Sequence, residues 1–244
     1  MKLQRLLSLT RQAIDAYHMI NPDDHIALGL SGGKDSLTLL YALANLRKFY
    51  PSSFQLSAIT VDLGLGNLFL EPIRTLCDEL SVPYQIIPTE IGKILFDIRK
   101  ESNPCSLCAK LRKGALNRTA KELGCNKVAY AHHRDDLIET MMLSLLYEGR
   151  FYAFSPYTYL DRMDLTVIRP LMFVTEPEVV GFQHKYQLPV CKNPCPVDGQ
   201  TKREYVKNLA KQLEKENPGA KNRMFRAILD GHIPGWPAAT TKTP

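Results

Sequence analysis

The sequence has no long hydrophobic run and no strong compositional bias. A membrane-spanning helix needs about 20 consecutive apolar residues, and charged or polar residues interrupt every apolar stretch of this 244-residue chain before that length. Lys2, Arg5, Arg11 and Asp15 interrupt residues 1–20, which excludes the apolar core of a signal peptide. Apolar residues at 45% and charged residues at 23% exclude a disordered or collagen-like chain. We therefore expect a soluble cytoplasmic protein without a membrane partner.

The chain contains cysteines, but in the cytoplasmic compartment expected for it they should not form disulfide bonds. Thiols stay reduced in the cytoplasm, so we expect the six cysteines to be free thiols, metal ligands or catalytic groups. They are Cys77, Cys105, Cys108, Cys125, Cys191 and Cys195.

Positive charge is in small excess and is concentrated in two segments. The net charge is +6, and residues 200–226 contain eight basic but only three acidic side chains. A second cluster without acidic residues comprises Lys110, Arg112, Lys113 and Arg118. Such clusters are either solvated helix faces or surfaces that bind the phosphates of a nucleic acid.

Short β-rich runs alternate with helical patterns, which is typical of a parallel sheet with crossover helices. The segment 26–30 is apolar at nearly every position, as expected for a central strand covered on both faces. We expect further strands at 56–61, 83–87, 128–131 and 167–170, and helices at 36–48, 71–80, 109–123 and 137–146. The predicted fold class is α/β, with a Rossmann-like parallel sheet and a short C-terminal helical extension.

The expected organisation has four parts. An N-terminal helix lies within residues 1–20, and the sheet domain covers 21–175. The helical extension covers 176–234, with helices at 176–186 and 202–216, the second of which is basic. Residues 235–244 are rich in proline and threonine and are expected to form a flexible tail.

Residues 31–36, Ser-Gly-Gly-Lys-Asp-Ser, stand between the buried strand and the first crossover helix. Glycines allow backbone N–H groups to turn inward, and the helix N-terminus and Lys34 add positive charge, so this loop suits a polyphosphate. Asp35 is placed to hold Mg²⁺ against the phosphates. The spacing is not that of a Walker A loop or of a dinucleotide-binding loop. The alternative is a glycine turn and helix cap without a ligand.

Two cysteines three residues apart, Cys105 and Cys108, begin a helix that carries Lys110, Arg112 and Lys113. Both sulfurs point to one side, so the pair could bind zinc, share an iron–sulfur cluster, form a redox pair or remain two thiols. Cys195 follows far downstream between two prolines, in a segment that does not suit a core cysteine.

Residues 131–136, Ala-His-His-Arg-Asp-Asp, follow the predicted strand at 128–131. This is the carboxyl end of a strand, where α/β sheets bind ligands. Asp135 and Asp136 are candidates for Mg²⁺ binding or acid–base catalysis, and helix capping is their structural alternative.

The hexapeptide resembles the pyrophosphatase loop of the N-type ATP pyrophosphatases, which cleave ATP between the α and β phosphates. Five motifs occur in the order of the tRNA 2-thiocytidine synthetase family, and the resemblance covers residues 3–226. They are the loop at 31–36, the segment 105–114, the run 131–136, Ile-Arg-Pro-Leu at 168–171, and Pro194 with Cys195. The resemblance implies a PP-loop ATP pyrophosphatase domain over 21–175 and 2-thiolation of a cytidine in the anticodon loop of tRNA.

The resemblance also implies ATP and Mg²⁺ as cosubstrates and a [4Fe-4S] cluster held by Cys105, Cys108 and Cys195. Where the family has a second cysteine after the proline this chain has Asp198, and Cys191 lies four residues upstream of Cys195, so Cys191 stays an alternative third ligand. The expected roles are as follows. ATP binding is assigned to Ser31, Gly32, Gly33, Lys34, Asp35, Ser36 and Asp62; catalysis to Lys34, Asp35, Arg112, Asp135 and Asp136; and RNA binding to Lys110, Arg112, Lys113, Lys207 and Lys211.

Adenylation of the pyrimidine O2 turns a poor leaving group into a good one, after which sulfide can displace AMP. The remaining length holds no second sulfur-transfer domain, so we expect a donor such as a cysteine desulfurase or free sulfide. A homodimer is a candidate assembly, and His133 or Tyr147 is a candidate for stacking on the target base. Alternatives are thiolation of uridine, a cysteine persulfide in place of the cluster, an amidating or lysidine-type ligase, and a non-catalytic nucleotide- or RNA-binding iron–sulfur protein.

Overall fold

The computed structural model describes residues 1–66, 70–99, 104–191, 195, 202–241 and 243. A six-stranded sheet has the order β3-β2-β1-β4-β6-β5. Five strands run parallel: β1 (Asp24–Gly29), β2 (Phe54–Asp62), β3 (Tyr84–Pro88), β4 (Lys127–Ala129) and β6 (Leu165–Ile168). The edge strand β5 (Tyr157–Leu160) is antiparallel to β6. The predicted α/β class with a largely parallel sheet is confirmed.

Strand β1 occupies the centre of the sheet because its side chains are apolar on both faces. Ile26, Ala27 and Leu28 are fully buried, and Ala27 pairs with Ser57 of β2 on one side and Val128 of β4 on the other. The chain adds β2 and β3 on one side of β1 and the later strands on the other side. Ligands of α/β proteins bind beyond the carboxyl ends of the strands at such a reversal, so this edge positions the site.

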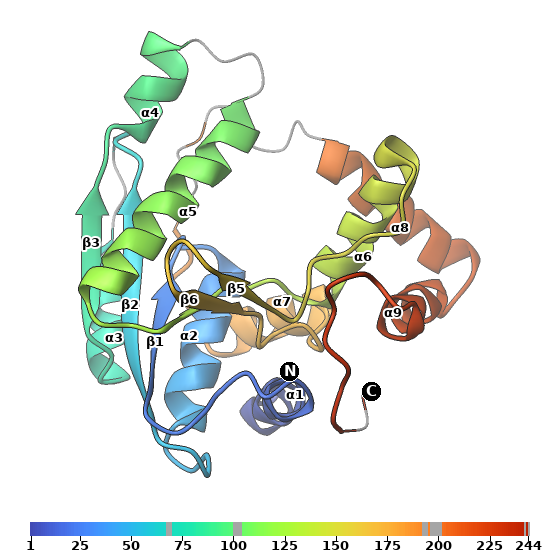
Figure 1. Cartoon of the computed structure of the whole chain (residues 1–244), viewed down its shortest axis with the longest axis horizontal. Helices are drawn as coiled ribbons and strands as arrows, with labels where there is room; N and C mark the ends of the chain where they lie inside the picture. Colours follow the sequence, from blue (N-terminus) through green and yellow to red (C-terminus); the bar gives the residue numbers. More distant parts are fainter. Residues whose placement is uncertain (67–69, 100–103, 192–194, 196–201, 242, 244) are drawn as a thin grey trace.

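The helices cover the two faces of the sheet unequally (Figure 1). One face carries α5 (Pro104–Glu122), whose Leu116 and Ala120 pack with Ala27, Ile59 and Val128 in a small core. The larger core lies on the other face, where residues of α1, α2, α3, α6 and α7 contribute. These helices span Leu3–Ala16, Lys34–Leu46, Glu71–Glu79, Arg134–Leu143 and Glu176–Lys185. The short α4 (Ile91–Lys93) continues into a π-helical turn, η1 (Ile94–Ile98).

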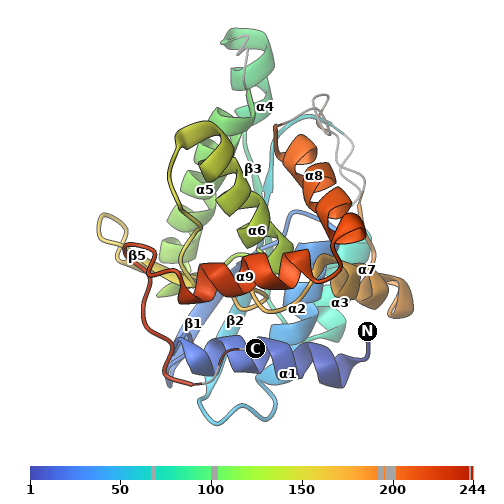
Figure 2. The same cartoon turned by 90° about the vertical axis from the view of Figure 1, so that its right-hand side faces the viewer.

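The C-terminal extension packs against the sheet domain through α6. Helices α8 (Lys202–Glu216) and α9 (Ala220–Asp230) both contact α6, and Figure 2 shows α9 lying across it. A π-helical turn, η2 (Ser144–Glu148), extends α6 at its C-terminal end. None of the helices in the described ranges is both long enough and apolar enough to cross a membrane.

The structure differs from the sequence expectations at several elements, and α4 with η1 is one that was not expected. The helix expected at 109–123 already begins at Pro104, because proline is compatible with the first turn of a helix. Strand β5 was not expected: most of its residues are exposed, so it has no apolar face to detect. Helix α9 was also missed, although Phe225 and Ile228 bury one face of it.

The tail is more firmly attached than its composition suggests. Trp236 donates its indole N–H to the carbonyl of Ala153 at 3.0 Å. The backbone N–H of Thr240 donates to the carbonyl of Ala16 at 2.8 Å. Residues 235–240, expected to be flexible, are therefore tied to α1 and to the body of the protein.

Candidate active site

The loop at residues 31–33 connects β1 to α2, so that Lys34 is the first residue of the helix. Gly32 has a φ of +78°, and a Cβ there would also lie 3.2 Å from the Cβ of Cys191. Ser31 Oγ accepts a hydrogen bond from the N–H of Gly33 at 3.3 Å, and Ser36 Oγ donates to the Gly33 carbonyl at 3.0 Å. The loop is thus preformed, and the free N–H groups of the first turn of α2 can bind an anion.

Two adjoining cavities open beside this loop. The first, about 350 Å³ in volume and here called the loop cavity, lies over the ends of β1, β2 and β4. Its lining includes Ser31, Ser36, Val61, Lys113, Tyr130 and His132. The second, about 400 Å³ and here called the cysteine cavity, is lined by Lys34, Cys105, Cys108, Glu176, Cys195, Arg203 and Lys207, among others. Asp35, Ala109, Arg112 and Asp136 line both cavities and form their shared wall.

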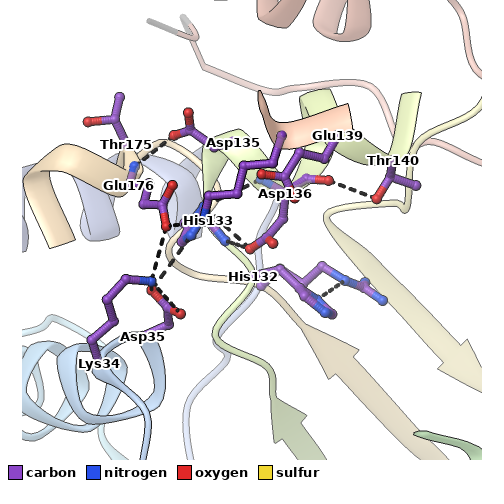
Figure 3. Close-up of polar contacts among 12 residues, drawn as sticks. Lys34, Asp35, His132, His133, Asp135, Asp136, Glu139, Thr140, Thr175 and Glu176 are labelled. Carbon is purple, nitrogen blue, oxygen red and sulfur yellow. Dashed lines mark hydrogen bonds and ion pairs between the residues drawn. The ribbon is translucent and has the colours of Figure 1, made fainter. Parts of the chain in front are cut away.

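Lys34 is paired with two carboxylates (Figure 3). Its Nζ lies 3.0 Å from both oxygens of Asp35 and 3.3 Å from Oε1 of Glu176. The same Glu176 oxygen accepts a hydrogen bond from Lys207 of α8 at 2.6 Å. Burial by itself would raise the pKa of Glu176, but Lys207 and Lys34 lower it to about 2. A triphosphate that enters the loop would therefore compete with an ionised Glu176 for Lys34.

His133 and Asp136 form a reciprocal cap at the start of α6. The N–H of His133 donates to Asp136 at 2.9 Å, and the N–H of Asp136 donates to His133 Nδ1 at 3.4 Å. Nε2 of His133 lies 3.6 Å from Asp35. His133 is buried and held by this cap, and it belongs to the lining of the cysteine cavity. Asp136 combines capping with a position in the shared wall.

Asp135 lies outside both cavities, unlike Asp136. It is buried, pairs with Lys221 of α9 at 2.7 Å, and accepts a hydrogen bond from the N–H of Glu176 at 2.7 Å. Although burial would raise its pKa, these contacts lower it. The geometry therefore makes Asp135 a support for Glu176 rather than a group that faces the reaction.

The three cysteines of the predicted cluster open into one cavity. Cys105 and Cys108 lie in the first turns of α5, and Cys195 lines the same cavity. Burial raises the pKa of the Cys108 thiol, Arg112 opposes this rise, and the neighbouring Cys195 and Cys105 add to it. Cys191 is placed elsewhere: its N–H donates to the Gly32 carbonyl at 2.9 Å, and it does not line the cysteine cavity.

These thiols suit an iron–sulfur cluster. Across the ranges that the structure describes, no three His, Cys, Asp or Glu side chains gather closely enough to hold one metal ion. A cubane cluster needs its cysteines farther apart, because each binds a different iron, and thiolates are the ligands that iron–sulfur clusters require. Three thiols around a cavity of about 400 Å³ therefore fit a [4Fe-4S] cluster.

The other predicted residues are distributed more widely. Asp62, at the end of β2, accepts a hydrogen bond from the N–H of Gly64 at 3.0 Å and lines neither cavity. Lys110 and Lys211 are exposed, as expected for RNA contacts. Lys207 points inward to Glu176, and Lys113 lines the loop cavity, where burial and then Arg169 and Arg203 lower its pKa.

Sequence reasoning missed Glu176, Glu139 and Arg203. Arg203 lies 3.2 Å from Glu139 and 3.5 Å from Asp136, so α8 is joined to α6 at the wall of the cysteine cavity. Glu176 follows Thr175, whose side chain caps α7 together with Glu178. This Thr-Glu-Pro-Glu sequence marks a helix start, but only the packing of α7 beside α2 directs Glu176 to Lys34.

Comparison with known proteins identifies a matching family and several relatives of this chain. Residues 5–213 match a family model described as a PP-loop domain. A tRNA-cytidine(32) 2-sulfurtransferase of Pelobacter propionicus is 39% identical over 94% of this chain and 86% of its own length. One from Geobacter sulfurreducens is 36% identical, with 93% and 90% covered.

Two solved structures are also similar. The U34-tRNA thiolase NcsA from Methanococcus maripaludis, solved with its [4Fe-4S] cluster, has a TM-score of 0.74 and 28% identity, with 93% of this chain and 79% of that chain covered. The NH3-dependent NAD synthetase of Campylobacter jejuni has a TM-score of 0.51 and 17% identity, with 95% of each chain covered, which is a likeness of fold alone.

Proposed function

Because the chain belongs to the PP-loop domain family and, within it, to the tRNA-cytidine(32) 2-sulfurtransferases, we propose that it replaces the C2 oxygen of cytidine 32 in tRNA with sulfur at the expense of ATP. The observation that carries the proposal is the shared wall of Asp35, Ala109, Arg112 and Asp136. This wall brings an anion-binding loop and three thiols into contact with the same residues. ATP chemistry and sulfur chemistry can therefore act on one base without its leaving the site.

The first step activates the base. The cytidine O2 attacks the α-phosphorus of ATP, the bond between the α-phosphorus and the bridging oxygen breaks, and pyrophosphate leaves. Lys34 and the N–H groups at the start of α2 stabilise the charge that develops on pyrophosphate. Asp35 and Asp136, which both belong to the shared wall, would hold Mg²⁺, because carboxylates are its preferred protein ligands.

The second step exchanges oxygen for sulfur. Sulfide attacks C2 and AMP leaves with the original oxygen, so the products are 2-thiocytidine, AMP and pyrophosphate. A [4Fe-4S] cluster held by Cys105, Cys108 and Cys195 would keep one iron without a protein ligand and so supply a position for the sulfur. Arg112 lines both cavities and is placed to hold the negative phosphate of the adenylate while C2 faces the thiols.

The remaining partners follow from this chemistry. The sulfur comes from a cysteine desulfurase or from free sulfide, and the reaction takes place in the cytoplasm, where tRNA is found. A homodimer is the assembly we propose.

The function is tested by the products. With anaerobically purified protein, Mg²⁺, sulfide and tRNA, ATP should be converted to AMP and pyrophosphate, and mass spectrometry of the digested tRNA should show 2-thiocytidine. Protein without tRNA is the control, since adenylation needs the base. Release of ADP and phosphate would contradict the proposal, and 2-thiouridine in place of 2-thiocytidine would move the activity to a different base.

The tRNA is held at the rim of the cysteine cavity. Lys110 of α5 and Lys211 of α8 are exposed on helices that both contribute to this cavity. Tyr147 of η2 is 47% exposed, and Nζ of Lys202 lies 4.5 Å from the centre of its ring. Lys202 precedes Arg203 and Glu204 of the cavity lining, so this aromatic ring stands where an unstacked loop base would enter.

Reversing both exposed charges, Lys110→Glu with Lys211→Glu, should weaken tRNA binding about tenfold at physiological salt. For each phosphate contact that is lost, the slope of the logarithm of the binding constant against the logarithm of the salt concentration should also fall in magnitude by about one. Binding is measured by filter assay or fluorescence anisotropy over a range of salt concentrations. Lys48→Glu, at the far end of α2 from the loop, is the matched control. Equal affinity of the double variant and the control would show that these lysines are only solvated.

A further inference from the structure

Arg169 belongs to the Ile-Arg-Pro-Leu motif, for which the reaction outlined above has no role. It follows β6 and is only 8% exposed. Its Nη1 donates to the carbonyl of Ser155 at 2.6 Å and to Thr158 Oγ1 at 3.4 Å. Within the described ranges no carboxylate forms an ion pair with it. Burying an arginine without a counter-charge is costly, which points to a function for its charge.

The remaining guanidinium contact is with His132. Nε of Arg169 donates a hydrogen bond to Nδ1 of His132 at 3.3 Å. Phe154 fixes both groups: its ring centre lies 4.5 Å from that of His132 and 5.0 Å from Cζ of Arg169. Arginine has donors only, so Nδ1 must be the unprotonated nitrogen, and a neutral His132 then carries its proton on Nε2.

The surroundings keep His132 neutral. Burial first, and then the positive charges of Arg169, Lys113 and Arg203, lower its pKa to about 3. His132 lines the loop cavity, and no group in the described part of the chain bonds to its Nε2. The cation bound at Nδ1 also draws electron density from the ring, which makes Nε2–H a stronger donor.

We propose that Arg169 is a positioning residue that locks His132 as a neutral Nε2–H donor for an acceptor atom of the nucleotide in the loop cavity. The occupant of that cavity rests on the function proposed above, in which it is ATP. A neutral donor orients the nucleotide without adding another positive charge beside Lys113 and Arg112. It also keeps the same form over the pH range in which an ordinary histidine gains its proton.

The tautomer can be measured without nucleotide. Nitrogen-15 NMR of histidine-labelled holoprotein should show His132 as the Nε2–H tautomer, unchanged between about pH 6 and pH 8, with the signal assigned from the His132→Asn variant. Arg169→Gln should allow both tautomers or titration in this range. Arg162→Gln, which removes an exposed positive charge, is the matched control and should leave the spectrum unchanged. A wild-type ring protonated on Nδ1, or titrating in this range, would overturn the proposal.

The second test is calorimetric binding of a non-hydrolysable ATP analogue to the holoprotein. His132→Gln can place an N–H donor where Nε2 stands, whereas His132→Asn reaches only the position of Nδ1. We expect about tenfold weaker binding for the asparagine variant and near wild-type binding for the glutamine variant. Unchanged affinity of the asparagine variant would overturn the proposal while leaving thiolation intact. Absence of analogue binding to the wild-type holoprotein would overturn both this proposal and ATP as the substrate.

Discussion

Replacing Lys34 with alanine should lower the rate of AMP and pyrophosphate formation about a hundredfold or more. A preorganised charged contact to a developing anion typically contributes that much to a rate. Lys34 is the first residue of α2, so its ammonium is carried beside the N–H groups that we propose bind the leaving pyrophosphate. Its side chain is 29% exposed, and Glu176 keeps Lys207 as a partner when Lys34 is removed. The fold should therefore survive the change, with a thermal midpoint within a few degrees of the wild type.

The rate is measured as pyrophosphate release in the presence of tRNA, and circular dichroism checks the fold. Lys48→Ala removes a lysine just beyond the C-terminal end of α2, away from the loop, and should leave the rate unchanged. If Lys34→Ala remained active, the loop would not be the site of ATP cleavage. If it lost its fold, Lys34→Met would keep the aliphatic part of the side chain and allow the same comparison.

Replacing Cys195 with alanine should remove the cluster completely, whereas replacing Cys191 with alanine should leave the cluster in place. Cys195→Ala removes a thiol that lines the cysteine cavity with Cys105 and Cys108. Cys191→Ala removes a thiol that packs against Gly32 of the loop, outside that cavity. Iron and sulfide content of anaerobically purified protein should fall to background in the first variant and stay at the wild-type level in the second.

The reverse result would make Cys191 the third ligand. Colourless wild-type protein with stoichiometric zinc would exclude the cluster itself. Cys77→Ala is a further control, since Cys77 is a buried core thiol whose pKa burial raises to about 12. It should keep both the iron and the brown colour.

The parts of the site that could be predicted are those encoded locally. The loop at 31–36 carries its glycines, lysine and helix start within six residues, and Cys105 and Cys108 share one helix turn. The central strand was evident from its apolar run, because β1 is buried on both faces. Joining Cys195 to the other two cysteines needed the family resemblance, since nearly ninety residues separate them.

The residues that could not be predicted meet only through packing. Glu176 reaches Lys34 because α7 lies against α2, and Lys207 turns inward because α8 packs on α6. From spacing alone, Lys207 and Lys211 lie on one basic face and look equivalent. The structure separates them, since Lys207 neutralises Glu176 and Lys211 stays in solvent. Asp135 and Asp136 are separated in the same way by Lys221 of α9.

Helix α5 is a single helix that contributes side chains to both cavities. Cys105 and Cys108 face the thiol side, Lys113 and Leu116 face the nucleotide side, and Arg112 serves both. Leu116 is so close to the sheet that a Cβ added to Gly29 would lie 2.7 Å from its Cδ2. A shift of the whole helix would therefore move the side chains of both cavities together. To evolve the enzyme toward a new sulfur acceptor, or to transfer the thiol site to another nucleotide-binding protein, one would have to keep α5 whole, with the side chains of both cavities.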